Sequence, residues 1–502
     1  MNIIGFNKNV SNQDNPWNQG NPWQTNYCKN STIFGKHTFV PFDTERQNND
    51  NTLIIGTSGT GKTYSFVEPN VLQGNANYVI ADAKGDILRN TGESLKKMGY
   101  KIQVLNLVDL AHSMTYNPLH YMKDQLSVFQ FAHTVVKSDI SGNVIQNMHE
   151  DPFWDNAAED LLLSLIFFTK EFLPKSEQTI ATVNRLFNLV NQSPDQINEV
   201  LSTLTNGSEL DHFSMTDYDP NNDTRTLGDY LFAWVAEQNP TSTALDMWRK
   251  VSTSKTSEKM WSSIVGILGS DLARYSLSDV ENLMNNNQIN FDALLEPKTA
   301  LFILYDDADT SKNFISNTLY TQLFSYLYHA ARLTNNRLPV KVRFFLDDFK
   351  NIQIPDFDDY LATARSRNIS ICMMLQDESQ LKAKFGINTP SVIGNCASYL
   401  LTGTTDLAMA NTASVRFSLA AEDIRIMDPN TFLVDIAGHR TSTERYDYQE
   451  HPNYISQKLD INSTYNTPIL DHSSVVQNWP KLVDILKHLP NEARERHSRW
   501  GL

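Results

Sequence analysis

A glycine-rich octapeptide constrains the fold of this chain more than any other feature of the sequence. The short apolar run Thr52–Ile55 (TLII) leads into residues 56–63, GTSGTGKT, which fit G-x-x-x-x-G-K-[ST] at every constrained position. Glycines at positions 59 and 61 let the backbone turn so that successive N–H groups face a phosphate. A helix that begins near Lys62 points the positive end of its dipole at the same anion. The octapeptide therefore predicts a strand, a phosphate-binding loop (P-loop) and a helix.

The polar side chains of the P-loop suit a nucleotide with a metal ion. Lys62 places an ammonium group between the β- and γ-phosphates, and the Thr63 hydroxyl is offered to Mg²⁺. We therefore expect ATP and Mg²⁺ as the ligands, and a chance glycine-rich turn is the alternative. The residues predicted to bind the nucleotide are Gly56, Thr57, Ser58, Gly59, Thr60, Gly61, Lys62 and Thr63.

Further strands are predicted on both sides of a long helical region. The apolar runs are residues 77–81, 101–107, 299–304, 342–346, 369–375, 398–401 and 432–436. Strands separated by helix-length segments predict an α/β fold with a parallel sheet and crossover helices. Between them, apolar residues recur at helical spacing, as from Trp154 to Phe168 behind a possible cap at Asp151. The helical region is therefore predicted to be an insertion into the α/β domain.

The length of 502 residues fits two or three domains. Residues 1–50 are rich in Asn, contain Asn-Pro-Trp twice, and are expected to form a polar N-terminal arm. We expect the nucleotide-binding domain over 51–120 and 291–470, the all-α insertion over 121–290, and a C-terminal tail over 471–502.

Composition and charge narrow the class of protein. No run reaches the roughly 18 apolar residues that a membrane-spanning helix requires, and the N-terminus lacks the pattern of a signal peptide. Three cysteines form no disulfide framework, so a cytoplasmic, reducing location is expected. The net charge of −15 argues against a protein that coats DNA generally. Any contact with nucleic acid is therefore expected at a local basic surface.

Two acidic pairs follow predicted strands and compete for one role. A P-loop ATPase needs a strand-end carboxylate for the Mg²⁺ water shell and a second group that polarises the attacking water. In the first pair, Asp347 is the candidate for the metal and Asp348 the candidate for the water. The second pair is Asp306 and Asp307. The pattern alone does not separate the two pairs, and capping of a turn is the structural alternative.

Two arginines and a glutamine complete the set of candidates. Arg365 and Arg367 precede the run 369–375, and Gln376 follows it. An arginine that reaches the γ-phosphate of a neighbouring subunit would neutralise charge in the transition state. A glutamine at a strand end can sense the γ-phosphate through a hydrogen bond. A surface arginine pair and a turn-capping amide are the structural alternatives.

Beyond the P-loop, the chain resembles the type IV secretion coupling proteins, which are conjugative ATPases of the TraG/TraD type. The likeness runs over roughly residues 50–455. It includes IADAKGDILRN from residue 80, YNPL from residue 116 and, most specifically, LDDFKNIQIPDFDDYLATARSRNISICMMLQDESQL from residue 346. These motifs are more specific than the P-loop, which by itself identifies only a superfamily.

The resemblance implies a RecA-like nucleotide-binding domain with an all-α insertion, assembled as a homo-hexameric ring. Such rings receive relaxase-bound single-stranded DNA, or a protein substrate, and pass it to the channel components of the secretion system of a plasmid. The resemblance assigns the Mg²⁺ shell to Thr63 and Asp347, and it favours the pair at 347 and 348 over the pair at 306 and 307. It makes Arg365 the finger rather than Arg367, and Gln376 the sensor.

Three departures from the family pattern affect these expectations. The second acidic residue is usually Glu, and Asp348 is shorter by one methylene, which predicts slow turnover or action through a second water. The family's D-P-K-G-E reads DAKGD from residue 82. Family members usually carry N-terminal membrane helices, and only 55 residues precede Gly56 here. We therefore expect either a variant that uses a separate membrane-anchoring partner at the cytoplasmic face of the membrane, or a chain that lacks its anchor.

Three hypotheses of function follow. The first is an ATP-driven coupling enzyme for DNA transfer. The second is an adaptor of the same fold that binds nucleotide with little or no hydrolysis. The third is a related ring ATPase that pumps DNA in packaging or chromosome segregation.

Overall fold

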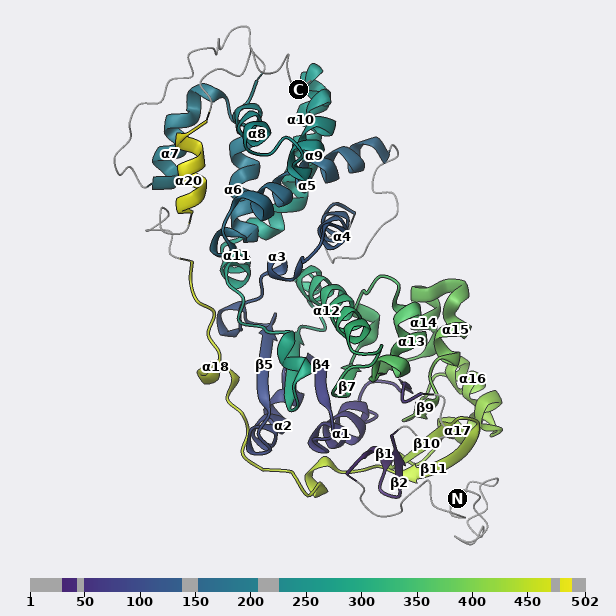
Figure 1. The fold of residues 1–502 in the computed structure, drawn as a ribbon. Coiled ribbons are helices and arrows are strands. Elements are labelled where there is room, and N and C mark those ends of the chain that lie inside the picture. Colours follow the sequence, from purple (N-terminus) through teal and green to yellow (C-terminus); the bar gives the residue numbers. More distant parts are fainter. Residues whose placement is uncertain (1–28, 43–48, 138–151, 206–224, 471–478, 490–502) are drawn as a thin grey trace. The chain divides into compact units, whose positions relative to one another are not determined.

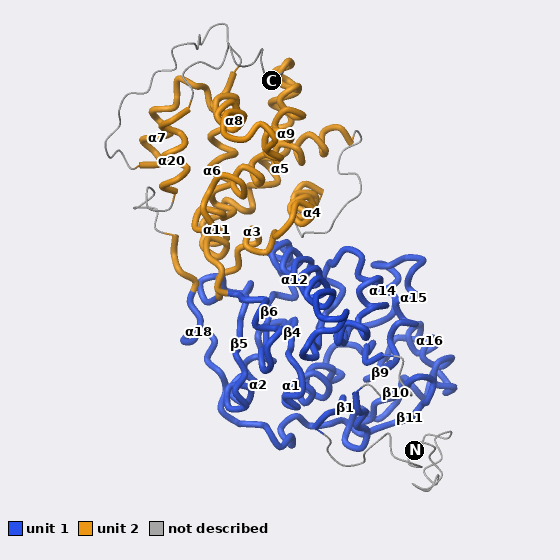
Figure 2. Tube along the Cα trace, viewed as in Figure 1, with its two compact units in different colours: residues 1–113, 289–466 blue, residues 114–288, 467–502 orange. Residues whose placement is uncertain are grey.

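The chain forms two compact units, each built from two stretches of sequence. A computed structural model describes residues 29–42, 49–137, 152–205, 225–470 and 479–489. The first unit comprises residues 1–113 and 289–466, and the second comprises residues 114–288 and 467–502 (Figure 2). The chain thus passes between the units after residues 113, 288 and 466, and the sequence analysis places its boundaries after residues 120, 290 and 470.

A nine-stranded sheet forms the centre of the first unit (Figure 1). Its order is β11-β10-β9-β3-β8-β7-β4-β6-β5, and the strands from β9 to β5 are parallel. All eight predicted strands are present, which confirms the α/β fold class. The bounds are β3 Thr52–Ile55, β4 Asn77–Ala83, β5 Lys101–Asn106, β6 Thr299–Tyr305, β7 Val342–Leu346, β8 Ile369–Leu375, β9 Ser398–Leu401, β10 Thr431–Ile436 and β11 His439–Glu444.

Two details of the sheet differ from a purely parallel arrangement. β10 pairs antiparallel with β9, and β11, which the sequence analysis did not predict, pairs antiparallel with β10. All six residues of β11 are polar and only one of them is buried, so this strand lacks the apolar run that revealed the other strands. The central strands are buried along their whole length, as expected for parallel strands covered on both faces.

The helices of the first unit connect these strands, except α18, Ile461–Thr464, which follows β11. A π-helical turn, Thr63–Val67, continues into α1, Glu68–Leu72. Pro69 has no N–H to give to the carbonyl of Ser65, which explains why the regular helical pattern is interrupted there. The other helices are α2 Asp86–Lys97, α12 Asn313–Leu333, α13 Phe357–Thr363, α14 Glu378–Phe385, α15 Thr389–Gly394, α16 Leu407–Phe417, α17 Ala421–Arg425 and α18 Ile461–Thr464.

Part of the expected N-terminal arm is an ordered hairpin of the first unit. β1, Ser31–Gly35, pairs antiparallel with β2, Thr38–Pro41. The Asn70 side chain accepts from the Ile33 N–H at 2.9 Å and donates to the Ile33 carbonyl at 2.8 Å. The buried Arg343 of β7 donates to the Thr32 hydroxyl at 3.0 Å. These contacts hold residues 31–41 against the α/β unit, whereas the Asn-Pro-Trp repeats and Asp151 lie outside the described residues.

The second unit is helical, in agreement with the periodicity of residues 154–168. Residues of α5 are buried on most sides, so it is the central helix of this unit. The helices are α3 Pro118–Tyr121, α4 Gln125–Val136, α5 Pro152–Phe172, α6 Ile180–Val190, α7 Ile197–Thr205, α8 Leu227–Gln238, α9 Thr243–Ser252, α10 Glu258–Ala273, α11 Ser278–Asn285 and α20 Pro480–Lys487. Among the described residues, none of the helices is both long and apolar enough to cross a bilayer.

The end of the chain is not a free tail where the structure describes it. The indole N–H of Trp479, a buried side chain, donates to the Thr182 hydroxyl at 2.7 Å. The carboxylate of the buried Glu177 accepts from the N–H groups of Lys481 and Leu482 at 2.8 and 2.9 Å. A carboxylate at the start of a helix satisfies N–H groups that have no partner within the helix. α20 is therefore fixed to the helical unit.

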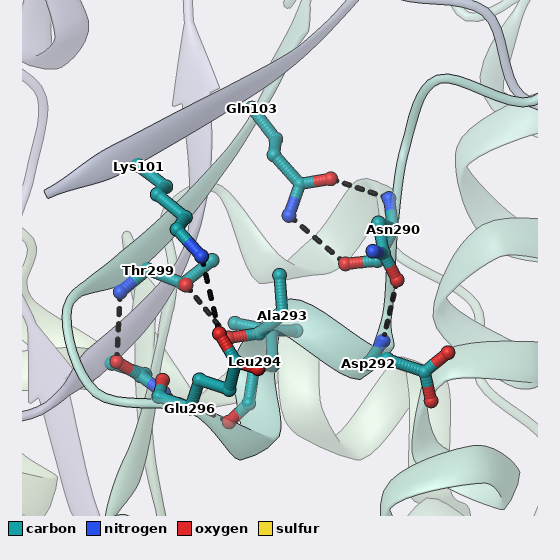
Figure 3. A network of polar contacts seen from close by, with 9 residues as sticks. Lys101, Gln103, Asn290, Asp292, Ala293, Leu294, Glu296 and Thr299 are labelled. Carbon is teal, nitrogen blue, oxygen red and sulfur yellow. Dashed lines mark hydrogen bonds and ion pairs between the residues drawn. The ribbon is translucent and has the colours of Figure 1, made fainter.

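A polar network fixes the segment by which the chain re-enters the first unit (Figure 3). The side chain of Asn77, at the start of β4, donates to the carbonyls of Leu294 and Glu296 at 2.8 and 2.7 Å. It also accepts from the Thr299 N–H at 2.8 Å. On β5, Gln103 Nε2 donates to the Asn290 carbonyl at 3.0 Å. The network thereby sets the position of β6 beside β4 and β5.

We predict that Asn77→Ala lowers the free energy of unfolding by about 2–3 kcal/mol, because buried backbone groups lose their partners. Lys101→Ala, which removes an exposed ion pair to Glu296 in the same network, should change it little. Urea unfolding followed by tryptophan fluorescence measures both variants. Equal effects of the two substitutions would contradict the role given to Asn77.

Candidate nucleotide-binding site

The predicted P-loop lies at the carboxyl end of β3. Gly59 and Gly61 have φ angles of +79° and +86°, a region that glycine enters without strain. Lys62 Nζ donates to the carbonyl oxygens of Gly56 and, at 3.2 Å, of Thr57. Burial lowers the pKa of Lys62, while the nearby carboxylates of Asp347 and Asp348 act in the opposite direction. A partly buried ammonium group is thus held at the phosphate-binding turn.

The end of β9 supports the P-loop from one side. The hydroxyls of Thr60 and Thr402 are 2.7 Å apart, and the Thr57 N–H donates to the Gly403 carbonyl at 3.3 Å. A Cβ atom added to Gly56 would lie 1.9 Å from Thr402 Oγ1, so only glycine fits there. Thr402 was not a candidate in the sequence analysis, and its place directly after the predicted run 398–401 is the signal that could have found it.

The carboxylate of Asp347 meets the P-loop from β7. Thr63 Oγ1 donates to Asp347 Oδ2 at 2.7 Å, and the Tyr305 hydroxyl donates to the Asp347 carbonyl at 2.7 Å. The competing pair is placed differently. Asp307 forms an ion pair with Lys84 at 3.1 Å, and Asp306 accepts from the Ala308 N–H at 2.8 Å. The geometry therefore brings Asp347, rather than the pair after β6, into contact with Thr63.

Asp348 lies next to this contact in an unusual backbone conformation. Its φ is +46°, the left-handed region. Asn351 Nδ2 donates to Asp348 Oδ2 at 2.8 Å, and Lys350 Nζ lies 3.7 Å from the same oxygen. Burial raises the pKa of the Asp348 carboxyl. One of its two oxygens is thus already held by a neighbouring side chain.

A cavity of about 490 Å³ opens beside the P-loop. Lys62, Thr63, Asp347, Asp348 and Gln376 all line it. Because β3, β7 and β8 are parallel neighbours, their carboxyl ends open on the same edge of the sheet. The fold thus gathers at one cavity side chains that are more than 300 residues apart in sequence.

Glu68, Asp82 and Asp86, which were not candidate site residues in the sequence analysis, also line this cavity, as does Asp307 of the competing pair. Glu68 accepts from Asn90 Nδ2 at 2.6 Å through one oxygen, and burial raises its pKa to about 8. Asp82 accepts from the N–H groups of Ile87 and Leu88, and burial raises its pKa to about 7. At neutral pH the Glu68 carboxyl is therefore mostly protonated, which limits its repulsion of a bound anion.

The predicted arginines lie away from this cavity. Gln376 directly follows β8, whereas Arg365 precedes it in a 3₁₀ turn, Ala364–Arg367. The seven residues of β8 separate the two by roughly 20 Å along the strand. Arg367 donates to the Asn336 carbonyl at 3.2 Å, while the exposed Arg365 guanidinium has no recorded partner in the part of the chain that the structure describes. Within one chain, Arg365 and the cavity are therefore not brought together.

The donor set at this cavity fits Mg²⁺ held together with phosphates. Among the described residues, the structure contains no group of three or more His, Cys, Asp or Glu side chains able to hold a metal. Mg²⁺ is commonly bound through one or two carboxylates with substrate phosphates and water, rather than by a cage of protein ligands. Thr63 and Asp347, which are in contact, are the residues that would hold it.

Solved structures of conjugative coupling proteins resemble this structure. The structure is similar to that of the bacterial conjugative coupling protein TrwBdeltaN70, with a TM-score of 0.55 and 15% identity over 86% of this chain and 92% of that chain. It is also similar to plasmid coupling protein TrwB in complex with ADP and Mg²⁺, with a TM-score of 0.53 and 15% identity over 86% and 93%. No curated protein sequence matches the chain. The sequence profile of the family "Type IV secretory system Conjugative DNA transfer" matches residues 6–414, and the chain belongs to this family.

Proposed function

We propose that this chain is a P-loop ATPase that couples ATP hydrolysis to conjugative DNA transfer. It would work in a ring and deliver relaxase-bound single-stranded DNA, or a protein substrate, to the channel of a type IV secretion system. The observation that carries the enzymatic part is the contact between the Thr63 hydroxyl and the Asp347 carboxylate beside the P-loop. Membership of the DNA transfer family supports the cellular role.

ATP and Mg²⁺ are the proposed ligands. The similar TrwB structures are described as complexes with the ATP analogue ADPNP and with ADP and Mg²⁺. In this chain, the N–H groups of residues 58–63 would hold the phosphates, and Lys62 would reach the β- and γ-phosphates. Mg²⁺, when bound, neutralises charge on the β- and γ-phosphates. Thr63 and Asp347 would orient its shell.

Asp348 and Gln376 are proposed to act on the reacting end of the nucleotide. Both line the cavity next to Lys62. The Asp348 oxygen that Asn351 does not hold would orient and polarise the attacking water. The main-chain N–H of Gln376 donates to Gln380 Oε1 at 3.0 Å. The side-chain amide of Gln376 would sense the γ-phosphate.

A homo-hexameric ring is proposed because Arg365 cannot serve the cavity of its own chain. The arginine lies at the amino end of β8 and the cavity at its carboxyl end. A finger supplied by a neighbouring subunit resolves this separation and couples hydrolysis to assembly. We also propose that a separate partner anchors the ring at the cytoplasmic face of the membrane. The net charge of −15 confines the DNA contact to a local surface of the ring.

A nucleotide-binding adaptor is the second candidate function. It is favoured by Asp348, which is one methylene shorter than Glu and has one oxygen held by Asn351. A misplacement near 1 Å can cost about 100-fold in rate. Hydrolysis in such a protein would be weak, and nucleotide binding would hold the ring together.

We predict that Lys62→Ala reduces ATP hydrolysis by at least about 100-fold, because a charged donor to the phosphates is lost. The purified chain is assayed with and without single-stranded DNA. Arg425→Ala, which removes a surface ion pair to Glu422, is the control and should leave the rate unchanged. Hydrolysis by Lys62→Ala at the unsubstituted rate would exclude this active site.

Asp348→Glu should raise the hydrolysis rate, because the longer side chain brings the carboxylate closer to the attacking water. The measurement is the steady-state kcat of both proteins. DNA-stimulated turnover of the unsubstituted chain would support the motor. Tight ATP binding without turnover, with hydrolysis restored by Asp348→Glu, would favour the adaptor.

Arg365→Ala should abolish hydrolysis, by about 1,000-fold or more, and leave ATP binding intact. A mixture of Arg365→Ala and Lys62→Ala chains should regain part of the activity, since one chain supplies the P-loop and the other the finger. Hydrolysis is measured as a function of the mixing ratio. Absence of any regain in assembled rings would contradict a finger acting between subunits.

A further inference from the structure

Arg445 lies against the P-loop, on the side opposite to Asp347. A Cβ atom added to Gly61 would lie 3.2 Å from Arg445 Nη1 and 3.3 Å from its Cζ. Arg445 directly follows β11, and the sheet order runs β11-β10-β9-β3-β8-β7. The P-loop at the end of β3 is therefore approached by a guanidinium from one side and by the Asp347 carboxylate of β7 from the other.

Neighbouring groups hold Arg445 in this place. Its main-chain N–H donates to the Asn430 carbonyl at 2.9 Å, which fixes the backbone just beyond β11. Its guanidinium lies over the ring of Phe432 in β10, 5.3 Å from the ring centroid. Contact with an aromatic face orients a guanidinium without occupying its N–H donors.

The guanidinium has donors that the chain itself does not use. In the part of the chain that the structure describes, no hydrogen bond or ion pair is recorded for its side-chain nitrogens. Its Nε is buried and has no acceptor. Leaving a buried donor without a partner is unfavourable, and a guanidinium pairs readily with phosphate oxygens. The Nη donors, which are not buried in this way, are the ones open to an anionic ligand on the P-loop.

We infer that Arg445 binds the α- and β-phosphates of the nucleotide on the P-loop of its own chain. This inference rests on the proposed nucleotide site. The β- and γ-phosphates are reached by Lys62, and the groups proposed to serve the γ-phosphate, Asp348 and Gln376, belong to the ends of β7 and β8. Arg445 approaches from the opposite direction, beside Gly61 and Ser65, where a Cβ on Gly61 would also lie 3.4 Å from Ser65 Oγ.

The chain would therefore use two arginines for different tasks. Arg445 acts within its own subunit and contributes to affinity for ADP and ATP alike, because both nucleotides carry the α- and β-phosphates. Arg365 acts on the neighbouring subunit and contributes to turnover. Hydrogen bonds to charged groups give an expected loss of affinity of roughly 10- to 100-fold when Arg445 is replaced by an uncharged side chain.

The test measures equilibrium binding of ADP and ATP to the full chain by isothermal titration calorimetry. Arg445→Gln should weaken ADP and ATP to the same extent, with and without Mg²⁺, and Arg445→Lys should recover part of the affinity. Affinity of the unsubstituted chain should fall more steeply with salt than that of Arg445→Gln. Arg440→Gln, on the exposed face of β11, is the matched control and should bind normally.

Each outcome separates this inference from the proposed function. If the unsubstituted chain binds neither ADP nor ATP, the proposed function itself fails. If it binds both, and Arg445→Gln binds them as tightly, Arg445 does not contact the phosphates. A loss confined to ATP would also overturn the assignment, because it would place the guanidinium at the γ-phosphate. Thermal unfolding without nucleotide identifies a variant that is merely misfolded.

Mixing experiments at an ATP concentration well below saturation give a second readout, which tells action within a chain from action between chains. At that concentration Arg445→Gln should hydrolyse ATP slowly, and mixing it with Lys62→Ala should give no regain, because no chain in the mixture has both Lys62 and its own Arg445. Regain comparable to that expected for Arg365→Ala would show that Arg445 acts on a neighbouring subunit, and would overturn the inference.

Discussion

Parallel pairing between β3 and its neighbours decides which polar groups of this protein can meet. In a parallel sheet all carboxyl ends open on one edge, so the residues that follow β3, β7 and β8 converge, although the chain reaches them at positions 56, 347 and 376. The contact of the Thr63 hydroxyl with Asp347 depends on this register. The same arrangement keeps Arg365 away from the cavity of its own chain, because this residue precedes β8 rather than follows it.

The long excursion into the helical unit has to leave this sheet register intact. The chain departs at residue 113 and returns at 289, and after a 3₁₀ turn it forms β6, which lies between β4 and β5. The side chains of Asn77 in β4 and Gln103 in β5 form hydrogen bonds to the returning backbone. These bonds position β6 in addition to the hydrogen bonds that it forms with its neighbouring strands. An insertion of this size is tolerated because the cost of closing a loop rises only slowly with its length.

Charge is distributed in a way that suits an anionic ligand despite an acidic chain. Glu68 and Asp82 would repel a phosphate if both were ionised, but burial raises their pKa values to about 8 and about 7. Lys62 and Arg445 supply positive charge at the loop itself, and Asp347 faces the place proposed for the metal. Local arrangement therefore outweighs the net charge of −15, as expected where screening limits the reach of distant charges.

The sequence by itself determined the P-loop, the eight apolar strands, the helical insertion and the family, because each is written in a local pattern or a specific motif. It could not separate Asp347 from Asp307 by pattern, since both follow buried strands, and only the strand order brings Asp347 to Thr63. The sequence also did not predict β11, the docked helix α20, or the roles of Thr402 and Arg445. Their burial or position depends on partners elsewhere in the fold. Tertiary structure alone decides such contacts, since polar side chains acquire their roles from what the fold places opposite them.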